Sequence, residues 1–208
     1  GNSNPDRFQV FAGALYFVVD ENGTGVESLW KTDGTAAGTE LVASAGGFAG
    51  RVDNLIVVGD VLFFVGVVGL GSEGEELFAV LPGGAVVLVD DHWSGSSSSQ
   101  PRHLTAFDGR LVYTAATALA GDLMVVDPAT LLPQLVAPLG EAAHMLAAAD
   151  DWLFFGARPS AGEPLRLGRW DGGAVLQPAG APAFAFGTFG EAVTLGNDLL
   201  VVGADLAG

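Results

Sequence analysis

The chain has 208 residues and a formal net charge of −16, because 24 acidic residues face only 8 lysines and arginines. Such a charge repels a phosphate backbone, so the composition disfavours nucleic acid as a partner. The absence of cysteine rules out disulfide bonds, thiolate metal sites and cysteine nucleophiles.

The chain is organised as a repeat, which two series of leucines measure independently. Members of the first series follow a turn signal such as Gly59-Asp60 or Asp108-Gly109 and precede two apolar or aromatic residues. Spacings in both series lie between 42 and 49 residues, the length of a four-stranded propeller blade. The first series is Leu15, Leu62, Leu111, Leu153 and Leu200, and the second is Leu29, Leu77, Leu123 and Leu165.

Each copy of the repeat predicts four short strands bounded by Gly, Pro, Asn and Asp. In chain order, the strands are expected at 8–12, 15–20, 28–32 and 40–43; at 54–58, 61–68, 76–80 and 85–89; at 103–107, 110–116, 122–126 and 134–136; at 145–148, 152–157, 165–169 and 174–176; and at 192–195 and 199–202. The fold class predicted is therefore all-β, a β-propeller of four-stranded blades with about four and a half blades in this chain. We expect one domain over 1–208, with blades at about 8–44, 52–91, 102–138, 143–178 and, in part, 187–208.

Two segments have an alternative interpretation that the repeat overrules. Residues 142–150 have helical propensity, but they fall where the first strand of a blade belongs. Residues 55–70 form the longest apolar stretch, which is shorter than the roughly 18 residues of a spanning helix. Gly59-Asp60 interrupts this stretch at a turn position, so it predicts two buried strands and no membrane span.

Four and a half blades do not close a ring, and an open sheet edge invites pairing with another chain. Three arrangements satisfy the pattern. The chain is a fragment of a longer propeller, or a small ring whose last blade borrows strands from the amino-terminal tail or from a partner, or an open array of repeats. The first residues contain no initiator Met, which suits a processed or truncated chain.

The repeat also carries a motif that resembles a known family. The run Leu-Trp-Lys-Thr-Asp-Gly-Thr-Ala-Ala-Gly-Thr-Glu-Leu-Val at 29–42 resembles the hallmark of bacterial ELWxxDGT-repeat proteins, and the segments 88–101 and 104–111 resemble the inter-repeat linker of that family. Later copies depart from the hallmark, with Phe78, Met124 and Arg166 in place of the Trp. The resemblance implies a propeller fold and a secreted or surface-anchored bacterial protein. It implies little about activity.

The motif Asp33-Gly34-Thr35 has a structural interpretation. An Asp side chain can accept hydrogen bonds from backbone amides two or three residues on, Gly supplies positive φ, and the Thr hydroxyl can bond the backbone again. The motif would then join the third strand of the blade to the fourth. The alternative is a ligand site built from repeated Asp-Gly-Thr loops. Trp170-Asp171-Gly172-Gly173 is expected to form a similar turn.

One loop offers oxygen ligands for a metal. Asp20 and Asn22 lie on a Gly-rich loop, with Glu27 close behind. Such ligands suit calcium, the only cofactor that the sequence suggests. The loop lacks the EF-hand pattern and does not recur in the other copies, so an ordinary polar hairpin loop is the competing interpretation.

A second candidate binding site lies around the Ser-rich linker after the second copy. Asp90, Asp91, His92 and Trp93 precede the serines, and His103 begins the next copy. A surface cluster of Trp, His and Asp can bind a sugar or a peptide through stacking and charge-assisted hydrogen bonds. The alternative is a linker that Trp93 packs over the edge of the blade.

The sequence predicts no catalytic residue. It has no G-x-S-x-G elbow and no phosphate-binding G-x-x-x-x-G-K loop, and no carboxylate pair stands out for glycoside hydrolysis. The function expected is therefore non-enzymatic: an extracellular or periplasmic scaffold that presents propeller loops to a protein partner or to other copies of the chain. The alternative is a carbohydrate-binding or glycoside-hydrolysing propeller, with a glycan as ligand.

Overall fold

The computed structural model describes residues 4–20, 25–42, 51–67, 74–95, 97–116, 120–140, 146–149, 151–158, 166–173, 175–176, 186–195 and 198–205. Every regular element within these ranges is a β-strand. A helix with the length and apolarity to cross a membrane is not found among the described residues.

The strands form five antiparallel sheets, and each sheet is built from strands that follow one another in the chain. The first sheet contains β1 (Asp6–Phe11), β2 (Ala14–Asp20), β3 (Glu27–Thr32) and β4 (Glu40–Leu41); the second contains β5 (Val52–Val58), β6 (Val61–Val67), β7 (Glu75–Val80) and β8 (Val86–Asp90); the third contains β9 (Arg102–Phe107), β10 (Arg110–Ala116), β11 (Gly121–Val126) and β12 (Pro133–Gly140); the fourth contains β13 (Leu146–Ala148), β14 (Leu153–Ala157), β15 (Arg166–Trp170) and β16 (Val175–Leu176); and the fifth contains β17 (Phe186–Leu195) and β18 (Asp198–Asp205).

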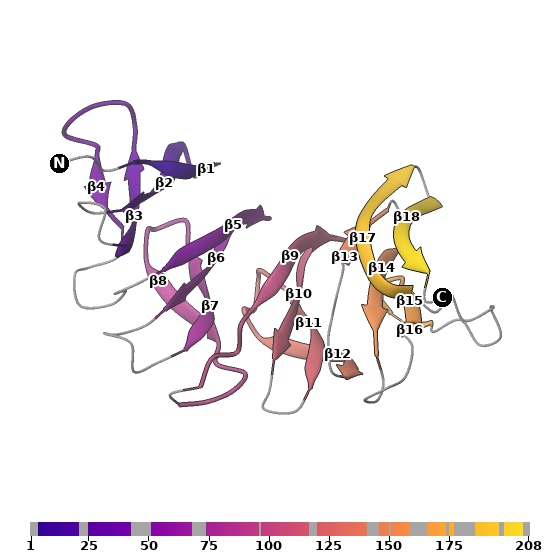
Figure 1. Ribbon diagram of the computed structural model, residues 1–208. Helices are drawn as coiled ribbons and strands as arrows, with labels where there is room; N and C mark the ends of the chain where they lie inside the picture. Colours follow the sequence, from indigo (N-terminus) through magenta and orange to yellow (C-terminus); the bar gives the residue numbers. More distant parts are fainter. Residues whose placement is uncertain are drawn as a thin grey trace.

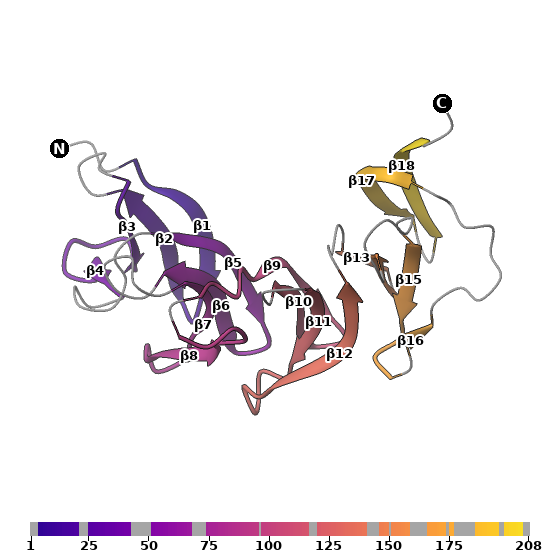
Figure 2. The ribbon, with the colours of Figure 1, turned by 60° about the horizontal axis from the view of Figure 1, so that its bottom comes forward.

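The five sheets stand side by side along an arc, with β1–β4 at one end and β17–β18 at the other (Figure 1). The turned view in Figure 2 shows the same succession from β1 to β18. The first strands of successive sheets are neighbours: β1 contacts β5, β5 contacts β9, β9 contacts β13 and β13 contacts β17. This arrangement confirms the all-β fold of four-stranded, radially repeated sheets that the sequence predicts.

The core consists of three apolar layers, one between each pair of adjacent sheets from the first to the fourth. In the first four sheets, the described members of the two leucine series lie on opposite faces of their sheets, and Leu165 lies outside the described residues. Each fully buried leucine contributes roughly 2 kcal/mol, and its place in the register fixes which neighbour it meets. The first series packs toward the preceding sheet, at Leu62, Leu111 and Leu153, and the second packs toward the following sheet, at Leu29, Leu77 and Leu123. The repeat in the sequence is thus a repeat of packing environments.

The predicted strands are confirmed to within a few residues over most of the chain. The largest difference is at the first strand of the fifth sheet, which was expected at 192–195 but extends over Phe186–Leu195. The next largest is at the fourth strand of the third sheet. That strand was expected at 134–136 but extends over Pro133–Gly140. It is the outermost strand of its sheet, so Pro138 has no ladder hydrogen bond to lose on the open side. In the segment with helical propensity, Leu146–Ala148 is strand β13, while 142–145 and 150 lie outside the described residues.

The first strands of three sheets share a local irregularity near their beginning. Arg7, Asn54 and His103 have φ of 50°, 54° and 56°, and the strand register shifts beside each of them. These residues are 47 and 49 positions apart, so the irregularity follows the repeat. A β-bulge of this kind turns a strand and redirects its side chains. Here it occurs where charged side chains meet.

Candidate functional site

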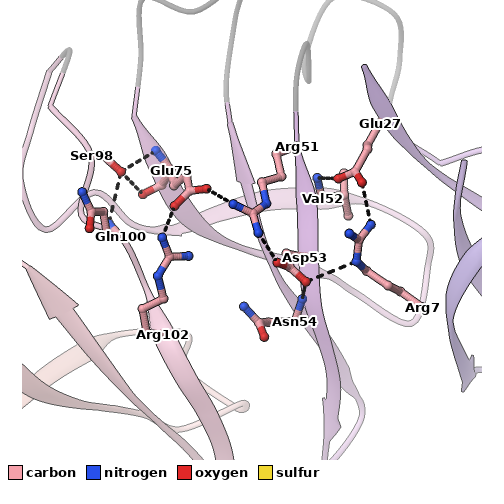
Figure 3. Close-up of polar contacts among 10 residues, drawn as sticks. All are labelled: Arg7, Glu27, Arg51, Val52, Asp53, Asn54, Glu75, Ser98, Gln100 and Arg102. Atoms are coloured by element: carbon pink, nitrogen blue, oxygen red, sulfur yellow. Dashed lines mark hydrogen bonds and ion pairs between the residues drawn. The ribbon is translucent and has the colours of Figure 1, made fainter. Parts of the chain in front are cut away.

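Charged side chains form a continuous row across the beginnings of strands in the first three sheets (Figure 3). We call Arg7, Glu27, Arg51, Asp53, Glu75 and Arg102 the charged row. Arg7 Nη1 donates to Glu27 Oε1 over 2.7 Å, and Arg7 Nε lies 3.3 Å from Asp53 Oδ1. Asp53 Oδ2 lies 2.8 Å from Arg51 Nη2. The row therefore joins the first sheet to the second.

The same alternation continues from the second sheet to the third. Arg51 Nη1 lies 3.3 Å from Glu75 Oε1, and Arg102 Nη2 donates to Glu75 Oε2 over 2.8 Å. Glu27 and Glu75 open the third strands of their sheets, opposite Asp20 and Val67 in the register. The equivalent residue of the third sheet is Gly121, opposite Ala116, so no carboxylate carries the row further at this position.

The charged row is electrically balanced and partly open to solvent. Burial would lower the pKa of Arg7, but the hydrogen bond that Arg7 donates to Glu27 and the charges of Glu27, Asp6 and Asp53 outweigh that effect and raise the pKa. The side chains of Arg51 and Arg102 remain 49% and 39% exposed. Exposed ion pairs of this kind contribute about 0–1 kcal/mol each. Arg51 and Arg102 are thus the most exposed side chains of the row.

A linker joins the second and third sheets beside the charged row. We call residues 91–95 and 97–101 the strap. Ser98 Oγ accepts from the backbone N–H of Glu75 at 2.8 Å, and Trp93 N–H donates to Ser99 Oγ over 2.9 Å. Gly74 is in close contact with the backbone of Ser97 and Ser98, so that any Cβ at this position would overlap the strap backbone. The strap is therefore a closed loop seated against strand β7.

The sequence-predicted cluster of Asp90, Asp91, His92, Trp93 and His103 is only partly brought together. His92 Nδ1 lies 4.0 Å from Asp90 Oδ2, and His92 Nε2 lies 2.9 Å from an oxygen of Asp122 on β11. Asp91 is exposed, and Trp93 is half-buried in the strap.

His103 and Asp90 are engaged by two neighbouring residues of β10. His103 Nδ1 lies 3.2 Å from Thr114 Oγ1. Tyr113 donates its hydroxyl to Asp90 Oδ2. Burial raises the pKa of Asp90, against the hydrogen bond from Tyr113 and the charge of His92, and burial with the nearby Asp90 carboxylate raises the pKa of Tyr113. Asp90 therefore lies in the interior of the interface between the second and third sheets.

The three residues proposed for calcium have other contacts or lie outside the described part of the chain. Asp20 Oδ1 accepts from the N–H of Gly25 at 3.0 Å. Glu27 binds Arg7 and also accepts from the N–H of Val52 at 3.1 Å. Asn22 lies outside the described residues. Among the described residues, no three His, Cys, Asp or Glu side chains are grouped to hold a metal ion.

Asp33, Gly34 and Thr35 form a hydrogen-bonded turn after β3. Asp33 Oδ1 accepts from the N–H and the hydroxyl of Thr35 at 2.9 and 2.7 Å, which lowers the pKa of Asp33, and Gly34 has φ of 94°. Thr35 Oγ1 accepts from the N–H of Gly38, which packs directly on the Asp33 carboxylate. These bonds span the connection from β3 to β4.

The same Asp turn recurs after the third strand of two other sheets. Asp171 Oδ1 accepts from the N–H of Gly173 at 2.9 Å. Asp127 Oδ1 accepts from the N–H of Ala129 at 2.8 Å, a turn that the sequence analysis missed because Pro128 replaces the glycine. The position relative to the second leucine series was the available signal.

Sequence analysis also missed Glu76 and the charged row. Glu76 is 4% exposed, and Ser99 N–H donates to its Oε1 over 3.1 Å. Burial raises its pKa to about 7, against the hydrogen bonds from Ser99 and with the charges of Asp91 and Asp90 adding to the rise. An acidic residue directly before the apolar run Leu77–Val80, on a predicted buried strand, was the signal for a buried carboxyl group.

Comparison with known proteins shows the fold. No family model matches the chain, and no curated protein matches it in sequence. Among solved structures, it is similar to a putative TolB from Agrobacterium tumefaciens (14% identity, TM-score 0.53, covering 99% of this chain and 72% of that one). It is also similar to TolB from Acinetobacter baumannii (12%, 0.50, 95% and 49%) and to the β-propeller domain of the Trilobed protease from Pyrococcus furiosus, described as having an open velcro topology (16%, 0.50, 85% and 55%). The fold is thus that of a β-propeller, and the chain spans about half the length of the Acinetobacter TolB and of the Pyrococcus propeller domain.

Proposed function

We propose that this chain is a non-enzymatic propeller scaffold of the ELWxxDGT-repeat type, secreted, on the cell surface or in the periplasm, that binds a protein partner at the charged row. The observation that carries the proposal is the charged row itself. It offers alternating charges at or beside the beginnings of strands, with the side chains of Arg51 and Arg102 partly exposed. Charge patterns of this kind set the orientation and the identity of a protein partner.

Two further observations support parts of this proposal. The Asp turn recurs at Asp33, Asp127 and Asp171, as expected if these are degenerate copies of the Asp-Gly-Thr motif. TolB is a propeller protein with a solved structure. This chain is similar to TolB over nearly the whole length of this chain. The location outside the cytoplasm rests on the resemblance to the ELWxxDGT family.

The test is cross-linking in cells that produce the chain, followed by measurement of the captured partner's affinity for purified variants. We expect Arg51→Glu combined with Arg102→Glu to weaken binding at least tenfold, because two like charges then face the partner's acidic groups. Lys31→Glu is the matched control, because Lys31 pairs with Glu40 outside the charged row. Its affinity should match that of the unmodified chain.

A glycan array and a panel of glycoside substrates test the alternative. Saturable glycan binding that is lost in Trp93→Ala, or turnover of a glycoside, would replace the scaffold proposal with a carbohydrate-binding or glycoside-hydrolysing propeller. If the affinity for the partner is unchanged when both arginines are substituted, the interface lies elsewhere on the molecule.

A further inference from the structure

Glu76 occupies an unusual position for an acidic side chain. It lies at the interface of the second sheet and the strap, with 4% of its surface exposed. Its Oε1 accepts from the N–H of Ser99, whereas Oε2 is shielded from solvent and meets no hydrogen-bond donor among the described residues. A buried carboxylate oxygen without a partner is costly, and the cost falls when the group takes up a proton.

The groups that face Glu76 increase this cost. From the end of β8, Asp90 and Asp91 both disfavour a negative charge on Glu76. From β10, Tyr113 approaches the same region and donates to Asp90.

The remaining charged groups nearby are engaged elsewhere. From the strap, His92 lies between Asp90 and Asp122 of β11. Glu75, the preceding residue on β7, forms ion pairs with Arg51 and Arg102 in the charged row. Within the described part of the chain, Arg51 and Arg102 pair with Asp53 and Glu75, and neither arginine pairs with Glu76.

The strap contacts Glu76 directly through Ser99. The Ser99 backbone is held on both sides, since its N–H donates to Glu76 and its C=O accepts from Ala116 N–H at 2.6 Å. Gln100 N–H donates to the Glu75 carbonyl at 3.1 Å. Lifting the strap breaks these few bonds and exposes the Glu76 carboxyl group.

We infer that the strap is a pH-sensitive latch, seated on the second and third sheets while Glu76 carries a proton and released when Glu76 ionises. On ionisation the proton passes to solvent, and the new charge gains hydration only if the strap opens. The folded pKa of about 7, raised mainly by burial, places this change near neutrality. Because the folded pKa exceeds the ordinary value of 4.5, the seated state is favoured at acid pH and loses its advantage as pH rises through 7.

Hydrogen exchange of the intact chain tests the latch. Protection of the Ser99, Gln100 and Ala116 amides is measured from pH 5.5 to 8.5, with each rate corrected for the intrinsic pH dependence of exchange. The opening constant should rise by roughly thirtyfold over this range if the pKa moves from 4.5 in the open state to about 7 in the seated state. Amides of Thr35 and Gly38, which are bonded within the exposed Asp33 turn of the first sheet and exchange by local opening, should keep constant corrected protection and serve as the internal reference.

Two variants decide the assignment. In Glu76→Gln, which mimics the protonated side chain, the corrected protection should no longer depend on pH. In Glu75→Gln, which changes the adjacent carboxylate but none of the backbone bonds to the strap, the pH dependence should persist. Carbon-13 NMR of the Glu side chains adds an independent readout: the resonance missing from Glu76→Gln should titrate near pH 7. A midpoint near 4.5, or pH-dependent protection that survives in Glu76→Gln, overturns the proposal.

Discussion

Glu75 and Glu76 are adjacent on β7 and chemically identical, yet their surroundings are opposite. Glu75 uses both carboxylate oxygens on arginines of the charged row. Glu76 points into the interface beneath the strap, with one oxygen satisfied by Ser99 and the other unpaired among the described residues. Alternation along a strand places successive side chains on opposite faces of the sheet, so one residue of difference separates a solvated ion pair from a buried acid. Four experiments test this contrast.

The largest effect is expected from Glu76→Gln at alkaline pH. The folded pKa of about 7 exceeds the ordinary 4.5, so ionisation opposes folding, and the stability present below pH 4.5 is lost as pH rises through 7. Removing the charge should raise the free energy of unfolding by about 1–3 kcal/mol at pH 8 and by little at pH 4.5. Denaturant unfolding at both pH values measures the difference. A variant that is less stable at pH 8 would show that the carboxylate has a partner after all.

Tyr113→Phe tests the other acid of the buried cluster. The tyrosine hydroxyl is the donor to Asp90 Oδ2, and its loss leaves that oxygen unsatisfied in the interior. We expect a loss of about 1–2 kcal/mol at pH 8 and a smaller loss at acid pH, where Asp90 can take up a proton. Thermal unfolding across this pH range checks both parts. An equal loss at every pH would attribute the effect to packing alone.

Glu75→Gln should have a smaller effect of a different kind. Its ion pairs are partly solvated, so we expect a loss of under about 1 kcal/mol that shrinks when salt is raised to 1 M. Between pH 6 and 8 the loss should stay constant. A loss that grows with pH would mean that Glu75 and Glu76 share one environment.

The smallest effect is the coupling between Glu75 and Arg102. A double-mutant cycle with Glu75→Gln and Arg102→Gln should give about 0.5 kcal/mol at low salt. The matched cycle with Arg51→Gln, whose contact with Glu75 is longer at 3.3 Å, should give less. Equal coupling in both cycles would show that the row acts through its total charge and not through its individual bonds.

The fold could be predicted from the sequence because its signals are local or strictly periodic. Leu62 and Leu111 have equivalent environments, each facing the preceding sheet, because the repeat preserves both the turn and the strand register. The Asp33 turn depends only on residues within a few positions of one another, so its geometry also follows from the sequence.

The polar interactions were harder to predict because their partners are distant in the sequence. Arg7 reaches Glu27 and Asp53, and Arg102 reaches Glu75 across 27 residues and two sheets. The repeat marks only the carboxylates Glu27 and Glu75, which open the third strands of their sheets, and this series ends at Gly121 in the third sheet. The burial of Glu76 depends on how the strap folds over it. The Ser-rich composition of the strap is typical of an open linker, so the sequence did not predict this burial.

Gly74 gives experimental access to the strap without any change of pH. Because Gly74 has no side chain, the backbone of Ser97 and Ser98 occupies the place where a Cβ would lie. A methyl group there would act as a wedge that props the loop away from β7, whatever the protonation of the acids beneath. Gly74→Ala is therefore a means of holding the molecule in its unlatched form, so that the consequences of opening can be studied at a single, constant acidity.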